Sequence, residues 1–254
     1  MYPRWRLILD EERSAAFNMA ADRAIFGLCA EGKCVPTLRI YGWNNPALSL
    51  GRLQYSLRGK LDFDYCRKSN IALVRRPTGG KAVLHGHDIT FSIVLPEELL
   101  PANQRSIVRS HQWLMSGIVE GLRSIIPEAE LGPESKTLNR NSASADCFAH
   151  VAECDVRAKK VKIVGAAQAR SCGAVIEQGS IPHTVPLVDP RQVFPGANPV
   201  EPTLKGVSRS SIVDALIDQF SKTLGIEFRA ETFSDEEYAA ALQIEEECCV
   251  EYPE

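Results

Sequence analysis

The sequence lacks any long apolar segment. None of the uncharged apolar runs among its 254 residues approaches the roughly 20 residues that a membrane-spanning helix requires. The opening stretch, MYPRWRLILDEERSA, contains acidic side chains and no continuous apolar core, which argues against a secretory signal peptide. We therefore expect a cytoplasmic protein with no membrane partner.

An excess of charge of one sign is also missing. Lys and Arg together number 29, Asp and Glu number 32, and the formal net charge is −3. A chain with this balance has no electrostatic footprint for general binding to nucleic acid or anionic membranes. Nucleic acid is therefore not among the expected partners.

The cysteines form no recognisable metal-binding or redox pattern. None of the eight belongs to a CxxC pair, and none clusters with histidine at the spacing of zinc ligands. Scattered cysteines in a reducing compartment are expected to be free thiols. Because none of them has the spacing of metal ligands, we also predict no metal site. The eight are Cys29, Cys34, Cys66, Cys147, Cys154, Cys172, Cys248 and Cys249.

The order of the expected elements favours an α+β fold. Strand-like runs are grouped in the middle of the chain and helical patterns lie near both ends, which predicts a mixed or antiparallel central sheet flanked by helices. No internal repeat or clear boundary is visible, so we expect one domain over residues 1–254. The expected strands are Trp5–Leu9, Thr37–Tyr41, Ala47–Leu50, Ile71–Val74, Ala82–His85, Ile89–Leu95, Cys154–Val156, Val161–Val164 and Ala174–Glu177.

Helix starts are marked by capping residues. Ser14 precedes an apolar pattern of helical spacing, and Ser234 with Glu237 forms a capping box. Two stretches have no regular pattern and are expected to be loops, Gly132–Asp146 and Pro182–Pro202. The other expected helices are Phe63–Ser69, Ser106–Ile126 and about Ser210–Leu224.

A basic, glycine-rich stretch separates two of the expected strands. Residues Arg75–Asp88 read RRPTGGKAVLHGHD. Gly79 and Gly80 can adopt positive φ and leave backbone N–H groups uncovered, and the arginines offer forked donors for an anionic group. The stretch fits neither a Walker A loop nor a GxGxxG loop. On these residues alone, a basic surface hairpin with a glycine bulge and a ligand-docking loop remain alternatives.

Several blocks of the sequence resemble one enzyme superfamily. RRPTGGKAVLH resembles the signature of the lipoate–protein ligase, octanoyltransferase and biotin–protein ligase superfamily. The blocks WRLI, FNMAADRAI, RIYGWNNPALSLG, KIVGAAQ and EQGSI resemble further parts of it in the same order, so the resemblance extends to about Ile181. It implies a lipoate-ligase-like fold, similar to class II aminoacyl-tRNA synthetases and biotin synthetase, whose glycine-rich loop lies over a lipoyl, octanoyl or biotinyl group. Lys81 resembles the octanoyltransferase branch, whereas Gly86 replaces an often acidic residue and leaves His87 and Asp88 without a role.

The resemblance assigns the catalytic role to a cysteine. Cys147 stands in SADCFAHVAECD, and this DCF with the following KIVG resembles octanoyltransferases of the LipM type, in which a cysteine here carries the acyl group. A thiolate suits the task because it is a strong nucleophile and exchange between thioesters is nearly isoenergetic. On the residues alone, Cys154 and Cys172 would compete with it.

The second catalytic residue implied by the resemblance is Lys162. By itself it reads as a solvated charge beside Lys159 and Lys160, but the lysine of KIVG is the family's near-universal one. As an ammonium it would favour a cysteine thiolate and stabilise charge on a thioester oxygen. As a neutral amine it would instead serve as a base.

The resemblance also implies a set of acyl-binding residues. His85 closes the glycine-rich motif at the family's position, although a lone histidine near a strand end is more often structural. Tyr41 and Trp43 are either walls of an acyl tunnel or ordinary core packing. The expected substrate-binding residues are Arg76, Thr78, Gly79, Gly80, His85, Gly165, Ala166 and Gln168.

These features predict a protein N-octanoyltransferase of lipoate biosynthesis that needs no cofactor. It would take octanoyl from acyl carrier protein, hold it as a thioester on Cys147, and pass it to a lysine of an apo-lipoyl domain. Such acceptors include the glycine cleavage H protein and the 2-oxoacid dehydrogenase E2. The alternatives are an ATP-dependent lipoate–protein ligase, an amidotransferase between lipoyl-domain proteins, and a non-catalytic lipoyl- or biotin-binding module.

Overall fold

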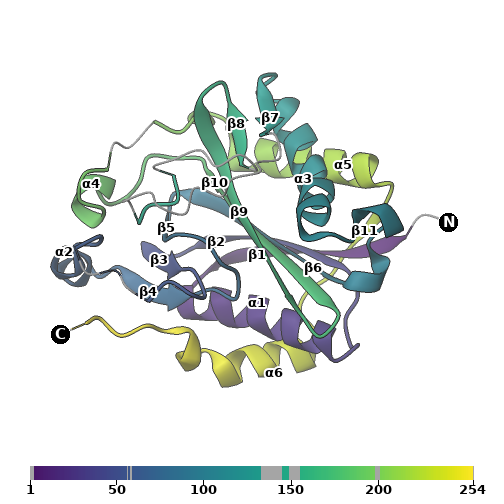
Figure 1. Ribbon diagram of the computed structural model, residues 1–254, viewed down its shortest axis with the longest axis horizontal. Coiled ribbons are helices and arrows are strands. Elements are labelled where there is room, and N and C mark those ends of the chain that lie inside the picture. Colours follow the sequence, from purple (N-terminus) through teal and green to yellow (C-terminus); the bar gives the residue numbers. More distant parts are fainter. Residues whose placement is uncertain are drawn as a thin grey trace.

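Within the described residues, eight strands form one mixed sheet through the middle of the molecule (Figure 1). The computed structural model describes residues 3–55, 57, 59–132, 145–148, 155–197 and 201–253. In spatial order the strands are β11 (Glu227–Ala230), β1 (Arg4–Arg13), β2 (Thr37–Trp43), β6 (Asp88–Pro96), β10 (Ala174–Pro182), β9 (Val161–Ser171), β8 (Val156–Ala158) and β7 (Ala129–Leu131). β1 is parallel to both neighbours, and the other neighbouring pairs are antiparallel.

Helices cover both faces of this sheet (Figure 1). α3 (Ile107–Arg123) and α5 (Arg209–Leu224) bury apolar side chains on one face, while α1 (Ala15–Ala30) lies on the other face and packs against α6 (Asp235–Ile244). The α+β prediction is confirmed. In the part of the chain that the structure describes, no helix has both the length and the apolar character needed to cross a bilayer.

Local signals account for where these helices begin and how closely they pack. The hydroxyls of Ser14, Ser106 and Ser234 each accept a hydrogen bond from a backbone N–H of the first helical turn, and the capping box at Ser234 is confirmed. Where α3 meets α5, a Cβ on Gly117 would lie only 2.6 Å from Cδ2 of Phe220. Glycine therefore permits the close approach of these two helices.

A second, three-stranded sheet carries the glycine-rich stretch. Its strands are β4 (Ala72–Arg75), β3 (Ala47–Leu50) and β5 (Val83–His85), with α2 (Phe63–Lys68) and α4 (Pro190–Val193) nearby. β3 lies between the other two strands, parallel to β4 and antiparallel to β5. The stretch after β4 therefore crosses over β3 to reach β5, so it is not a hairpin turn.

Several short elements were not expected from the sequence. β7, with three residues, and β11, with four, are too short to show a period, and α4 is a single turn within Pro182–Pro202. The predicted loop Gly132–Asp146 lies largely outside the described residues, as does Cys154. The described residues also form 3-10 helices at Glu97–Leu99, Ala102–Gln104 and Glu246–Cys248.

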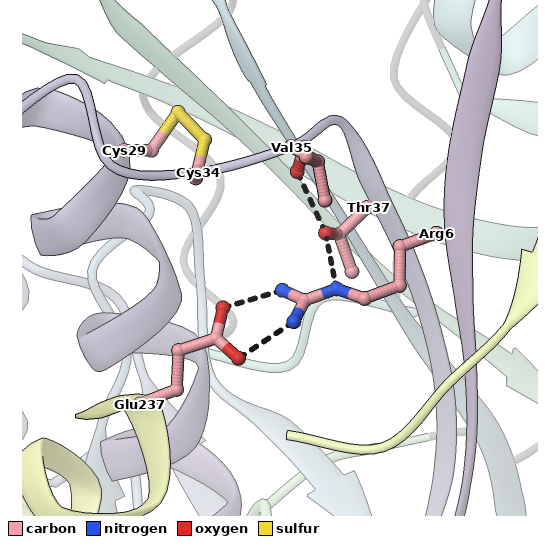
Figure 2. The surroundings of a disulfide bond; sticks show 6 residues. All are labelled: Arg6, Cys29, Cys34, Val35, Thr37 and Glu237. Atoms are coloured by element: carbon pink, nitrogen blue, oxygen red, sulfur yellow. Dashed lines mark hydrogen bonds and ion pairs between the residues drawn. A yellow bond between two sulfur atoms is a disulfide. The ribbon is translucent and has the colours of Figure 1, made fainter. Parts of the chain in front are cut away.

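Cys29 and Cys34 form a disulfide at the end of α1 (Figure 2). Gly32, with φ of +76°, turns the chain there and helps to bring the two Cα atoms within 4.5 Å of one another. The expectation of free thiols is wrong for this pair, because periodicity and spacing did not reveal the tight turn. The described cysteines that are free are Cys66, Cys147, Cys172, Cys248 and Cys249.

The C-terminal elements return to the N-terminal strand. The guanidinium of Arg6 in β1 binds both carboxylate oxygens of Glu237 in α6, and its Nε donates to Oγ1 of Thr37 at 3.0 Å (Figure 2). Further along, the N–H of Val250 donates to the carbonyl of Leu73 at 2.9 Å. The C-terminal part of the chain thus binds to both β1 and β4.

Candidate active site

Cys147 lies beside the chain that enters β5. Its backbone N–H donates to the carbonyl of Ala82 at 2.9 Å, and the N–H of Ala82 donates to the carbonyl of Ala145 at 3.0 Å. Oδ1 of Asp146 accepts from the N–H of Phe148 at 2.9 Å and turns the chain just after the cysteine. These bonds fix the backbone of Cys147 against the glycine-rich stretch.

Lys162 extends from β9 to the same cysteine. Its Nζ lies 3.3 Å from Sγ of Cys147 and 3.0 Å from the carbonyl oxygen of Cys147, and it pairs with Oδ2 of Asp155 at 2.8 Å. Burial by itself lowers the pKa of an ammonium group, but the negative charges of Cys147 and Asp155 outweigh it and raise the pKa of Lys162 above its ordinary value. Lys162 is therefore an ammonium at neutral pH.

Gly165 allows this close approach of the cysteine to β9. A Cβ at this position would lie 3.2 Å from Sγ of Cys147 and 3.2 Å from Cε of Lys162. Both distances are shorter than ordinary van der Waals contact, so a side chain here would displace the thiol or the lysine. Glycine leaves the space that the pair occupies.

The guanidinium of Arg76 holds the glycine-rich loop together. It donates to the carbonyls of Ser49 at 2.6 Å, Gly79 at 2.7 Å and Lys81 at 2.6 Å. Burial lowers the pKa of Arg76 to about 10, an effect partly offset by the negative charge of Cys147. Arg76 therefore remains cationic at neutral pH and adds positive potential around the thiol.

The two glycines of the loop have different requirements. Gly80 has φ of +92°, and a Cβ there would lie 2.9 Å from Nη2 of Arg76. Gly51, after β3, lies so close that its own Cβ would be 2.1 Å from the carbonyl oxygen of Gly80. A Cβ on Gly79 would meet no atom within 4 Å. The close approach of loop and β3 thus depends on glycine at 51 and 80 but not at 79.

We expect Gly80→Ala to lower both the melting temperature and the rate of acyl transfer, and Gly79→Ala to change neither appreciably. Alanine at position 80 would have to adopt a disfavoured positive φ and move Arg76, which costs about 1–3 kcal/mol. Thermal unfolding and transfer kinetics of the two variants provide the measurement. Equal effects at both positions would show that this backbone conformation does not matter.

A narrow cavity has Cys147 in its wall, and we call it the Cys147 cavity. Met19, Tyr41 and Trp43 supply large side chains, while β9 and β10 contribute small residues such as Ala166 and Gly179. Other lining residues are Ser49, Arg76, Gly80, Val83, His85, Thr90, Gly165, Ala167, Gln178 and Ser180.

His85 is held rigidly at the wall of this cavity. Its Nε2 lies 2.7 Å from Oγ of Ser49, its Nδ1 lies 2.8 Å from Oδ2 of Asp88, and its ring stacks on Trp43 with 3.9 Å between centroids. Burial by itself raises the pKa of Asp88, but His85 and hydrogen bonds outweigh it and lower that pKa well below its ordinary value. Asp88, left without a role by the sequence, therefore orients His85 as a charged carboxylate.

Thr78 reaches the site through a buried polar network. Its hydroxyl donates to Oε1 of Gln178 at 2.8 Å, and Nε2 of Gln178 donates to Oδ2 of Asp22 at 2.6 Å. Asp22 in α1 in turn pairs with Arg39 in β2 at 2.8 Å. Thr78 thus ties the loop to the main sheet. Gln178, in the EQGSI block but not among the expected site residues, lines the cavity.

Gln168 is not brought into this cluster. Its side chain donates to Oε2 of Glu177 at 3.1 Å and accepts from Oγ of Ser110 in α3 at 3.0 Å. Gln168 and Glu177 are opposite one another in the β9–β10 pair and both interact with groups from α3, on the other side of the sheet. A shift of one residue along β9 decides which face a side chain takes.

Of the other two candidate cysteines, the structure describes only one. Cys172 is exposed in the turn between β9 and β10, and Cys154 lies outside the described residues. Within the described ranges, no three His, Cys, Asp or Glu side chains are grouped in a way that could hold a metal ion.

Comparison with known proteins gives the family. Residues 14–236 match the family described as the lipoyl protein ligase A/B catalytic domain. The chain belongs to this family. The lipoyl protein ligase A/B family thus accounts for the blocks that the sequence shares with lipoate–protein ligases and octanoyltransferases.

Individual members of the lipoyl protein ligase A/B family support this assignment. Octanoyltransferase LipM of Exiguobacterium sp. is 41% identical over 185 residues, which are 71% of this chain but only 66% of that protein. Octanoyltransferase LipM of Halalkalibacterium halodurans is 31% identical over 270 residues, 96% of this chain and 95% of that protein. The chain thus spans just under two thirds of the first relative and nearly all of the second.

A solved structure confirms the lipoate-ligase-like fold. The bi-partite lipoate protein ligase of Thermoplasma acidophilum, described with its E2 lipoyl domain, superimposes with a TM-score of 0.75 at 25% identity. The match covers 96% of this chain and 92% of that one. The two sheets and their helices are therefore those of the lipoyl protein ligase A/B family.

Proposed function

We propose that this chain is a cysteine-dependent protein octanoyltransferase, working as one domain over residues 1–254 in the cytoplasm. One observation carries the proposal: Sγ of Cys147 lies 3.3 Å from the ammonium of Lys162, in the wall of a narrow cavity. The relatives named octanoyltransferase LipM support the same activity. The proposed cycle has two half-reactions and needs no cofactor.

In the first half-reaction, the thiolate of Cys147 attacks the carbonyl carbon of an octanoyl thioester on acyl carrier protein. Negative charge develops on the carbonyl oxygen, where the ammonium of Lys162 and the buried guanidinium of Arg76 stabilise it. The bond to the carrier sulfur then breaks, and the carrier thiolate leaves and takes a proton from solvent. Octanoyl remains as a thioester on Cys147, with its chain in the Cys147 cavity.

In the second half-reaction, the neutral ε-amine of an acceptor lysine attacks this thioester. A C–N bond forms, the C–S bond breaks, and the thiolate of Cys147 returns beside Lys162 while the surplus amine proton passes to solvent. Lys162 stabilises charge here, because the carboxylate of Asp155, 2.8 Å away, still favours its protonated form while Cys147 is acylated. The acceptor is the lysine of a lipoyl domain, such as the glycine cleavage H protein or E2; the description of the T. acidophilum ligase with an E2 lipoyl domain supports this kind of partner.

The decisive experiment compares donors with and without nucleotide. Octanoyl-acyl carrier protein and an apo-lipoyl domain should give octanoylated domain, seen as a mass increase, at the same rate whether or not ATP is present. Free octanoate with ATP is the control and should give none. If product forms only from free octanoate and ATP, the chain is a ligase and the proposal fails. An octanoylated H protein offered as donor separates amidotransfer from transfer by the carrier protein.

A further inference from the structure

A second cavity adjoins the Cys147–Lys162 pair. β9 lines the Cys147 cavity with residues 165–167 and this second cavity with residues 161–163. β10 runs alongside in the same way, with Ser180 in the first and Pro182 in the second. The segment around the thiol also contributes to both cavities, with Cys147 lining the first and Phe148 lining the second. The two cavities therefore follow one another along β9 and β10, with Lys162 at their junction.

The second cavity is the roomier of the two, about 210 Å³ against about 40 Å³. Phe148 and Phe194 give it apolar walls, and the exposed Lys160 stands at its edge beside Lys162. An acyl chain bound in the Cys147 cavity would leave the second cavity empty. The proposed reaction must account for this space, because Lys162 lines it and Phe148 follows the reactive cysteine in its wall.

His87 in this cavity has a buried ring nitrogen with no partner among the described residues. Within the described residues, its Nδ1 has no hydrogen-bond partner. Its backbone is fixed, since its carbonyl accepts from the N–H groups of His183 at 3.0 Å and Thr184 at 2.9 Å. Burial lowers the pKa of His87, so its ring is neutral at pH 7 and offers one donor and one acceptor. A buried polar atom left without a partner is costly, which points to a ligand group that supplies one.

The geometry of a thioester determines what this ligand is. The carbonyl carbon attacked by Cys147 carries an acyl chain on one side and the arm of the leaving thiol on the other. With the acyl chain in the Cys147 cavity and the carbonyl at Sγ, the thiol arm must extend past Lys162. We infer that the second cavity holds the phosphopantetheine arm of the acyl donor, with its amide groups at His87 and its phosphate near Lys160.

The chemistry of that arm fits these residues. Phosphopantetheine is a flexible chain with two amide groups, each a donor and an acceptor, and it ends in a phosphodiester. A neutral imidazole can pair with an amide, apolar walls accept the methylene groups, and an exposed ammonium attracts the phosphate. After the carrier thiol leaves, the same space is open to the acceptor lysine, which is consistent with a two-step cycle. This inference rests on the proposed function.

The first test compares two octanoyl thioesters that differ only in the arm. Octanoyl-coenzyme A carries the full phosphopantetheine arm, and the octanoyl thioester of 2-mercaptoethanol carries neither of its amide groups. Acylation of the protein is followed by intact mass. His87→Ala should lower the acylation rate from octanoyl-coenzyme A roughly five- to tenfold more than the rate from the short thioester, with His87→Gln recovering part of the loss. Equal losses from both donors, or none, would overturn the inference.

A second, charge-based comparison uses neighbouring lysines. Lys160→Ala should weaken the use of octanoyl-coenzyme A about two- to fivefold at low salt, and the loss should shrink as salt is added. Lys159→Ala is the matched control, because Lys159 pairs with Glu128, just before β7, and does not line the cavity. Identical effects of the two substitutions would contradict a phosphate at Lys160.

A binding measurement separates this inference from the proposed function. Calorimetric titration of Cys147→Ala protein with phosphopantetheine requires no acyl transfer. Binding that His87→Ala weakens several-fold supports the inference even if the wild-type chain transfers no octanoyl. Absence of binding overturns it, and so does binding of AMP in the same cavity when phosphopantetheine does not compete. Failure of the wild-type protein to accept octanoyl from octanoyl-acyl carrier protein is instead a failure of the proposed function.

Discussion

Replacement of Cys147 by alanine is expected to abolish the octanoyl-enzyme and to reduce protein octanoylation by at least about a thousandfold. The thiol is the atom that forms the covalent bond, and the surrounding cations cannot substitute for it. Incubation of the wild-type protein with octanoyl-acyl carrier protein alone should add one octanoyl mass. The adduct should be labile to hydroxylamine and should map to Cys147.

Cys172→Ala is the control for this experiment. Cys172 is an exposed free thiol in the turn between β9 and β10, away from the Cys147 cavity, so its loss should leave both the adduct and the transfer rate unchanged. A melting curve of Cys147→Ala checks that the fold survives. Full transferase activity in Cys147→Ala would end the thioester mechanism.

Replacement of Lys162 by methionine should slow acylation of Cys147 by about a hundred- to a thousandfold. The ammonium that lies 3.3 Å from Sγ is lost, while the carboxylate of Asp155 remains nearby and repels a thiolate. Without the neighbouring ammonium, the thiol of Cys147 should lose its proton less readily. The pH at which it reacts with iodoacetamide should therefore move upward. Stopped-flow acylation and a pH series of alkylation rates measure the two effects.

Lys159→Met removes the same charge from the same hairpin and should leave both measurements unchanged. Lys159 is exposed and pairs with Glu128 at 3.4 Å, away from the thiol. If Lys162→Met lowered the transfer rate but left the alkylation profile in place, Lys162 would act on the oxyanion alone. If both quantities stayed at wild-type values, Lys162 would have no catalytic role.

Local signals in the sequence were enough to predict the class of the fold. Serine caps fixed the starts of α1 and α6, and apolar periodicity predicted α3. Short elements were missed because β11 gains its order from pairing with β1 rather than from its own four residues. The Cys29–Cys34 disulfide was missed for a similar reason, since the turn at Gly32 creates the proximity.

The site was only partly predictable from the sequence. Its residues lie in separate sequence blocks, and only the folded sheets bring those blocks together. Cys147 and Lys162 were singled out by resemblance, and the structure joins them across 15 positions of sequence. Gln168 and Gln178 illustrate the limit. Both stand in recognisable blocks, yet the register of β9 with β10 turns the first towards α3 and the second into the Cys147 cavity. The sequence of one strand alone does not determine how it is registered against its neighbour.

The Arg6–Glu237 pair has a consequence for how the chain is made. The two residues are 231 positions apart, and one edge of β1 also remains unpaired until β11 has been synthesised. At about 5–20 residues per second, a ribosome takes roughly 10–50 s to release the partner of Arg6. Throughout that interval the nascent chain carries an unpaired strand edge and an unneutralised guanidinium. α6 and β11 therefore stabilise β1 only after the residues near position 237 have been synthesised.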